Sequence, residues 1–271
     1  MKQLVSTDWL EHNLDKVKIL DTSWHLPSSE RNAEKEYKLC HIKNSIFFDI
    51  DKFSNQNSSL PHMLPSKSDW ENIVSRLGIK NSDHVVAYDN SEVFSSCRVW
   101  YTFIYFGHDP NLISVLDGNF EKWLHEKRPI SKEILKISRS EYKASEDTTL
   151  VINKNQVNEN IKKKKFLLID ARGEKRFLGL QPEPRKGMRS GHIEGSKNLP
   201  FRLLINQNRT FKKIDELAGI FKEKEISLHK DKAFTCGSGI TACILGLANS
   251  LITDKKPKIY DGSWAEYGLK K

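Results

Sequence analysis

The chain has 271 residues, enough for one large or two ordinary domains. Its 44 basic and 35 acidic residues give a formal charge of +9, which suits nucleic acids, membrane surfaces or small acidic substrates. The N-terminal stretch lacks an apolar signal core and no apolar run approaches membrane-spanning length, so we expect a cytoplasmic protein with no membrane contact.

Strand and helix patterns alternate along the first half of the chain. We expect a helix over residues 4–14, with Ser6 or Thr7 as its N-cap, and then a buried strand at 17–21 (VKILD). A turn and a strand are expected within 37–49, further strands at 84–89 and 114–117, and helices at 69–77, 96–106 and 118–125.

The second half of the chain runs in the same order. The strand FLLID at 166–170 matches VKILD, and IYDGSWAEY near the end matches VLDGNFEKW in the first half. Asp170 follows Asp21 by 149 positions and Cys236 follows Asp89 by 147 positions. This steady spacing predicts two copies of one domain.

Alternating strands and helices predict an α/β fold, with a parallel sheet flanked by helices in each copy. We expect an N-terminal domain at residues 1–135, a polar linker at 136–152 and a C-terminal domain at 153–271.

The most informative stretch is the loop that begins at Cys236. The end of a short strand at 231–235 precedes it, a helix of small and apolar residues at 241–251 follows it, and Gly237 and Gly239 lie between them. A glycine-containing loop before a helix N-terminus can point several backbone N–H groups at an anion. A thiolate or persulfide on Cys236 is such an anion, so we expect this cysteine to be a nucleophile rather than a buried structural residue.

The repeat supports this interpretation of Cys236. At the matching position the first copy has Asp89, and the Gly-x-Gly turn is absent there. A cysteine needed only for packing would more plausibly be matched by a small apolar residue than by an aspartate. We therefore expect the first copy to keep the fold without the nucleophile.

The cysteine spacing, the glycine pattern and the lysine distribution give no sign of a metal site, a bound cofactor or a nucleic-acid-binding surface. The four cysteines contain no CxxC pair, so no metal site is expected and a reducing compartment fits free thiols. No glycine-rich dinucleotide fingerprint follows a strand, so we expect no cofactor. The lysine run at 162–165 is interpreted as solvent-exposed, and no RNA-binding motif is visible. Whether Cys243 has a redox role is left open.

Several motifs in order carry a family resemblance over essentially the whole chain. They are CGSGITA from Cys236, GHIEGS from Gly191, RFLG from Arg176 with PEPR from Pro182, YDGSW from Tyr260 and HMLP from His62. With them the chain resembles the two-domain rhodanese-type sulfurtransferases, the thiosulfate/3-mercaptopyruvate sulfurtransferase family. The resemblance implies two rhodanese-like domains, an inactive first one and a catalytic second one with a persulfide intermediate on Cys236. Glu194 stands where the family has a proline, a difference confined to a turn.

The loop residues indicate which sulfur donor is used. In this family the thiosulfate enzymes carry basic residues just after the nucleophile, whereas Gly237 and Ser238 are neutral here. We therefore expect 3-mercaptopyruvate, whose single carboxylate would bind Arg176 and Arg185 in the loop between the strand and turn motifs. The resemblance places substrate at these two arginines.

The remaining predicted site residues surround the nucleophile. Gly237, Gly239, Ile240 and Thr241 are expected to line the substrate site with their backbone. Ser238, two residues from Cys236, could donate to the enolate of the leaving pyruvate. The resemblance further implies a relay of Ser238 with His62 and Asp51 from the first copy. His62 could instead satisfy loop backbone, and Asp51 could cap a turn.

Two other functions stay open on the same fold. The chain could be a thiosulfate:cyanide sulfurtransferase, or a sulfur carrier that receives persulfide sulfur from a protein partner. A cysteine phosphatase would need an arginine at the far end of the loop, but Ala242 stands there. The expected acceptors are a thiol such as thioredoxin, a small thiol or cyanide. The oligomeric state is left open, with a monomer favoured.

Overall fold

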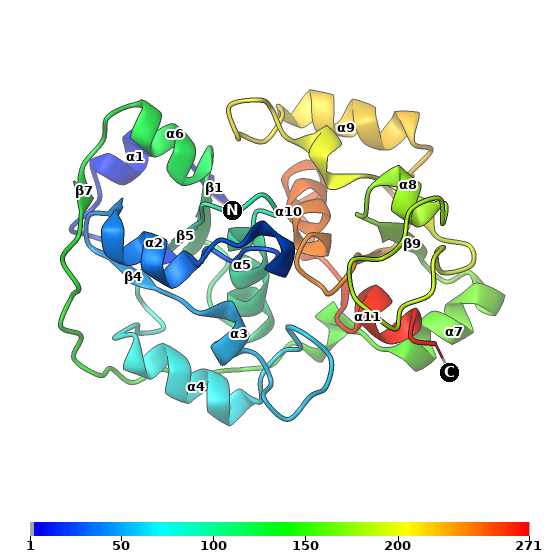
Figure 1. The fold of residues 1–271 in the computed structure, drawn as a ribbon, viewed down its shortest axis with the longest axis horizontal. Helices are drawn as coiled ribbons and strands as arrows, with labels where there is room; N and C mark the ends of the chain where they lie inside the picture. The colour runs from blue at the N-terminus through cyan, green and yellow to red at the C-terminus, as the bar shows by residue number, and fades with distance from the viewer. Residues whose placement is uncertain (1–2, 271) are drawn as a thin grey trace. The chain divides into compact units, whose positions relative to one another are not determined.

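The computed structural model describes residues 3–270 of the chain (Figure 1). It divides into two compact units. The first contains the chain up to Gln56 with Leu64–Asp147 and Gln207–Thr210, and the second contains Asn57–Met63, Thr148–Asn206 and the chain from Phe211 onward. Each unit therefore includes one short arm from the other half of the sequence.

The first unit is built on a parallel five-stranded sheet in the order β1-β6-β5-β2-β4. The strands are β1 (Leu4–Val5), β2 (Lys18–Asp21), β4 (Ser45–Phe47), β5 (Val85–Tyr88) and β6 (Ile113–Leu116). The central strand β5 is buried along its whole length, as expected for a parallel strand covered on both faces.

Helices cover both faces of this sheet (Figure 1). Helices α1 (Thr7–Glu11) and α6 (Asn119–His125) pack on one face, where Leu10 and Trp123 join a core with the strands. Helices α4 (Lys67–Arg76) and α5 (Ser96–Tyr105) pack together on the other, with the Trp70 ring 5.0 Å from that of Phe103. The remaining elements are α2 (Ala33–Leu39), α3 (Ile50–Phe53) and an antiparallel pair of β3 (His41–Ile42) and β7 (Ile130–Ser131).

The second unit has its own parallel sheet in the order β10-β9-β11-β12-β8. The strands are β8 (Val151–Ile152), β9 (Leu167–Asp170), β10 (Lys197–Asn198), β11 (Lys232–Thr235) and β12 (Ile259–Tyr260). The helices are α7 (Lys154–Lys163), α8 (Glu174–Phe177), α9 (Ile214–Glu223), α10 (Ala242–Thr253) and α11 (Ser263–Tyr267). Within this unit α9 and α10 lie on the opposite side of the sheet from α7 and α11 (Figure 1).

The two sheets have the same strand order once the repeat is applied. Strands β1, β6, β5, β2 and β4 correspond in turn to β8, β12, β11, β9 and β10. The predicted α/β fold with a parallel sheet in each copy is confirmed. The duplication also extends to the backbone, because Asn119 and Ser263, which match across the two copies, both have a left-handed φ, of 51° and 48°.

Some predicted elements differ from those observed. The helix expected over residues 4–14 is a two-residue strand, β1, followed by the five-residue helix α1. Ser6 is the N-cap, and its side chain accepts a hydrogen bond from the backbone N–H of Trp9 at 3.1 Å. Leu4 and Val5 instead pair in parallel with β6, where their backbone hydrogen bonds add an edge strand to the sheet. Helices α2, α7 and α9 are not among the predicted elements. The lysine run at 162–165 is exposed, as expected.

The segment after β7 has no helix up to Asp147 and is hydrogen-bonded to the first unit. The backbone N–H of Ser145 donates to the Phe106 carbonyl at 2.9 Å, and the Tyr142 side chain is buried. Among the described residues no helix is both long and apolar enough to cross a bilayer.

Matching buried aspartates end β2 and β9, but they have different surroundings. Asp21 accepts hydrogen bonds from the backbone N–H and the hydroxyl of Ser23, at 3.0 and 2.6 Å. Burial raises the pKa of Asp21 to about 6. Asp170 instead meets the guanidinium of Arg172, 2.7 Å away. The first copy therefore keeps a buried carboxyl group without the arginine that accompanies it in the second.

We predict that Asp21 makes the folded protein less stable as pH rises from about 4 to about 6. The folded state holds this proton up to a pKa of about 6 whereas the unfolded chain releases it near 4, so the stabilising contribution is lost over that interval. The loss amounts to about 3 kcal/mol. Denaturant unfolding of wild type and Asp21→Asn at several pH values should show the variant gaining relative stability by this amount. Asp109→Asn, an exposed aspartate of the same unit, serves as the control; equal pH slopes in all three proteins would contradict the prediction.

Candidate active site

The loop after β11 begins with Cys236, whose side chain is a free thiol and only 1% exposed. The first turn of α11 holds this loop. The backbone N–H groups of Trp264 and Ala265 donate to the carbonyls of Cys236 and Gly237, at 3.0 and 2.8 Å. The N–H of Cys236 donates to the Ser263 hydroxyl at 3.2 Å. The backbone position of Cys236 is therefore set by a neighbouring helix and not by the loop alone.

The residues after Cys236 have backbone N–H groups at the N-terminus of α10 that are available to bind a ligand. Within the part of the chain that the structure describes, the N–H groups of Gly237, Ser238, Ile240 and Thr241 donate to no protein acceptor. Such donors are expected in the first turn of a helix, and together with the helix dipole they favour an anion. α10 has 12 residues and is buried over most of its length, so the dipole acts in an apolar surrounding.

Gly239 and Cys243 shape the far side of the loop. Gly239 has φ of +80°, a conformation that side-chain-bearing residues rarely adopt. The thiol of Cys243 donates to the Gly239 carbonyl across 3.2 Å. Ile240 is buried, and Thr241 is half-buried at the N-cap of α10. The Cys243 thiol is thus engaged in a hydrogen bond at the start of α10.

The matching loop of the first unit contains its own anion. One carboxylate oxygen of Asp89 accepts from the N–H of Ser91 at 2.8 Å, and the other accepts from the N–H of Ser96 at 2.9 Å, at the start of α5. Asp89 is fully buried, and burial raises its pKa, an effect that the Ser96 and Ser91 hydrogen bonds offset in part. The N–H of Ser91, which matches the open donor of Ser238, is therefore satisfied by the Asp89 side chain in the first unit.

Both predicted arginines reach the loop in the second unit. A Cβ atom placed on Gly237 would lie 3.3 Å from Nη2 of Arg176 and 3.9 Å from Nη1 of Arg185. A side chain at position 237 would therefore crowd the guanidinium group of Arg176 and lie in ordinary contact with that of Arg185. The structure brings Arg176, Arg185 and the loop backbone together, and their binding of one anionic ligand stays a prediction.

A buried acid lies behind Arg176. Glu183, with a side chain only 4% exposed, accepts from Nε and Nη2 of Arg176 at 3.2 and 2.6 Å. It also accepts from Nη1 of Arg172 at 2.8 Å. The Nε–Nη2 edge of Arg176 is thus engaged by Glu183 and is not available to chelate a ligand. The sequence did not predict this ion-pair network.

Arg172 connects the two sides of the site. Its side chain is fully buried, and its guanidinium carbon lies 4.4 Å from the ring centroid of Trp264, the residue whose N–H donates to the Cys236 carbonyl. Burial alone would lower the pKa of Arg172, but Asp170 and Glu183 raise it above its ordinary value. Arg172 therefore stays charged in the interior. The available signal was its position two residues after Asp170, at the carboxyl end of a buried strand.

His62 lies beside Ser238. Its Nδ1 is 3.0 Å from the serine Oγ, and the His62 side chain is buried with φ of +60°. The arm Asn57–Met63 that carries it belongs to the second unit. Asp51 lies in α3 of the first unit, where its carboxylate accepts from the Trp24 indole N–H at 2.9 Å. The Ser238–His62 pair is therefore present, and the place of Asp51 in the relay stays a prediction.

The second copy has a matching arm, Gln207–Thr210, which belongs to the first unit. Its Arg209 has φ of +66°, close to that of His62. Arg209 pairs with Glu92, in the loop that follows Asp89, and donates to Glu121 at 2.8 Å. The two arms thus follow the repeat: His62 contacts the Cys236 loop, and Arg209 contacts the loop that follows Asp89.

Comparison with known proteins identifies the repeat. The family described as "Rhodanese-like domain" matches residues 6–126 and again 153–270. The chain is 38% identical to 3-mercaptopyruvate sulfurtransferase of Mus musculus, covering 99% of this chain and 93% of that protein. It is also 38% identical to thiosulfate sulfurtransferase of Rattus norvegicus, covering 98% and 92%. The crystal structure of SseA from Escherichia coli, a 3-mercaptopyruvate sulfotransferase, matches with a TM-score of 0.88 and 31% identity, over 98% of this chain and all of that one.

Proposed function

Because the chain belongs to the rhodanese-like domain family and contains two tandem copies of that domain, we propose that it is a sulfurtransferase that uses 3-mercaptopyruvate as donor. Sulfur would pass through a persulfide on Cys236 to a thiol or to cyanide. The observation that carries this proposal is the loop itself, where Cys236 stands at a set of open backbone donors with two arginines against Gly237.

The proposed first step is a nucleophilic displacement at sulfur. The Cys236 thiolate attacks the donor's sulfur, an S–S bond forms and the donor's C–S bond breaks. The electron pair of that bond goes to carbon and leaves as the enolate of pyruvate, which takes up a proton. Cys236 then holds the outer sulfur as a persulfide, an anion that the open N–H groups of the loop would stabilise.

The second step returns the enzyme to its starting state. An acceptor thiolate or cyanide attacks the outer sulfur, and the S–S electron pair returns to Cys236 as thiolate. A protein dithiol such as thioredoxin or a small thiol would serve as acceptor. The free cysteines suit a reducing compartment, and we propose the cytoplasm.

The Ser238–His62 pair supplies a hydrogen-bonding group next to the reaction. Ser238 is two residues from Cys236, and the His62 ring at 3.0 Å can accept or donate a proton at the serine oxygen. We propose that this pair donates to the enolate oxygen or delivers its proton, with Asp51 as a third member.

The donor preference follows from charge and space. Gly237 and Ser238 bring no positive charge to the loop, and a larger residue at 237 would meet Arg176. A single carboxylate held by arginine side chains fits this arrangement better than a compact dianion such as thiosulfate. The likeness to a thiosulfate sulfurtransferase at the same identity keeps thiosulfate as the second donor to assay.

Steady-state assays of pyruvate and thiocyanate release test this function. With cyanide as acceptor, we expect kcat/KM for 3-mercaptopyruvate to exceed that for thiosulfate at least about tenfold, and Cys236→Ser to abolish both activities. Cys243→Ser is the control, because its thiol contacts a carbonyl. A preference for thiosulfate would contradict the assignment. Negligible turnover, combined with persulfide loading from a desulfurase protein, would instead indicate a sulfur carrier.

We predict that Arg185→Ala raises the KM for 3-mercaptopyruvate about 10- to 100-fold, since charged hydrogen bonds contribute about 1.5–3 kcal/mol. Michaelis–Menten kinetics with saturating acceptor would measure this change. Arg202→Ala, which removes an exposed arginine of the same unit, should leave KM near the wild-type value. A lower melting temperature with unchanged KM would show that Arg185 is structural.

A further inference from the structure

Glu183 is a charged residue of the site that the proposed steps do not use. Its carboxylate is almost fully buried and accepts three hydrogen bonds, one from Arg172 and two from Arg176. Nη2 of Arg176, which bonds Glu183 at 2.6 Å, is also the atom 3.3 Å from a Cβ position on Gly237. The carboxylate charge therefore lies one guanidinium away from the nucleophile loop.

The charges of this cluster cancel. Asp170 and Glu183 contribute two negative charges, and Arg172 and Arg176 contribute two positive ones, all joined by ion pairs of 2.6 to 2.8 Å. The side chains of Asp170, Arg172 and Glu183 are at most 4% exposed, so water and salt screen these three charges poorly, whereas the Arg176 side chain is 26% exposed. Arg176 consequently brings its N–H groups to the loop together with a compensating negative charge.

We propose that Glu183 is a specificity-determining residue that favours singly charged donors over doubly charged ones, by lowering the positive charge beside the Cys236 loop by one unit. This inference rests on the proposed sulfurtransferase function. Electrostatic energy scales with the product of the charges, so the Glu183 carboxylate opposes a dianion such as thiosulfate twice as strongly as a monocarboxylate donor at the same position.

The hydrogen bond from Arg172 fixes the position of the Glu183 carboxylate. Arg172 holds Glu183 from the interior, and Arg172 is itself fixed by Asp170 and by the carbonyl of Gly191, at 2.7 and 2.9 Å. Arg172 is therefore a positioning residue for Glu183. A fixed buried charge discriminates between ligands more strongly than a mobile exposed one, because neither the charge nor the surrounding solvent rearranges much to weaken its electric field.

Donor specificity of the full-length chain tests this proposal. The quantity to measure is kcat/KM for 3-mercaptopyruvate divided by kcat/KM for thiosulfate, with cyanide as acceptor. Glu183→Gln keeps the size of the side chain and removes its charge, and we expect it to lower this ratio at least about tenfold, through a rise in the thiosulfate value. The ratio does not depend on the fraction of folded enzyme, because misfolded protein lowers both values equally.

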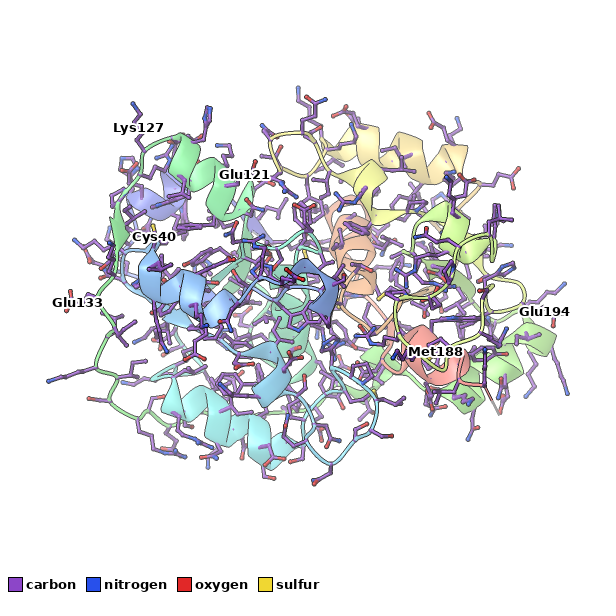
Figure 2. All side chains as sticks on the ribbon, in the orientation of Figure 1. Cys40, Glu121, Lys127, Glu133, Met188 and Glu194 are labelled. Carbon is purple, nitrogen blue, oxygen red and sulfur yellow. The ribbon has the colours of Figure 1, made fainter. Side chains whose placement is uncertain are left out.

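Matched variants separate charge from shape. Glu183→Asp keeps the charge and should stay near the wild-type ratio, whereas Glu183→Ala removes the charge without introducing an amide and should change the ratio in the direction of Glu183→Gln. Glu194→Gln removes the same charge from an exposed residue of the same unit, one that lies at the periphery of the view in Figure 2, and should leave the ratio unchanged.

The outcomes distinguish this inference from the function on which it rests. A wild-type enzyme that transfers sulfur while Glu183→Gln and Glu183→Ala keep its donor ratio would overturn only the role of Glu183. A wild-type chain that turns over neither donor would overturn the proposed function itself. If neither uncharged variant folds, Glu183 is a folding residue and the specificity role is rejected.

Discussion

The whole site depends on how the backbone around Cys236 is held. The N–H groups of α11 donate to the carbonyls of Cys236 and Gly237. Within the described residues, the N–H groups of Gly237, Ser238, Ile240 and Thr241, at the N-terminus of α10, have no protein acceptor. Open donors at a buried helix end are unfavourable unless an anion or water meets them. That constraint makes a sulfur anion on Cys236 a stabilising partner of the fold as well as the proposed reactive group.

The two copies solve this constraint in different ways. The first copy meets its helix N-terminus with the Asp89 carboxylate, and the second leaves the matching position to a cysteine. Likewise Asp21 is hydrogen-bonded by Ser23, whereas Asp170 is paired with Arg172 and, through Glu183, with Arg176. In both cases the aspartate of the first copy is hydrogen-bonded within its own loop, whereas the matching position of the second copy is a cysteine or an ion-paired aspartate. Duplication therefore preserved the sheet while the ends of its strands diverged.

Much of this could be predicted from the sequence. The repeat offsets and the alternating strands predicted two parallel α/β sheets, and the ordered motifs predicted the rhodanese-like family, both of which are confirmed. Arg176 and Arg185 do lie against Gly237. The Glu183–Arg172 network could not be derived from spacing, since an acid among prolines in a polar loop gives no sign that it is buried. Helix α7 was missed because its sequence is almost entirely polar, with only Val157 buried.

The central claim is that Cys236 carries the transferred sulfur covalently, and intact-mass spectrometry tests it most directly. After brief mixing with 3-mercaptopyruvate and no acceptor, the wild-type chain should gain the mass of one sulfur atom, about 32 Da, and cyanide should remove it. Cys236→Ser should gain nothing under the same conditions. No mass gain in the wild type, or an equal gain in the variant, would contradict the account.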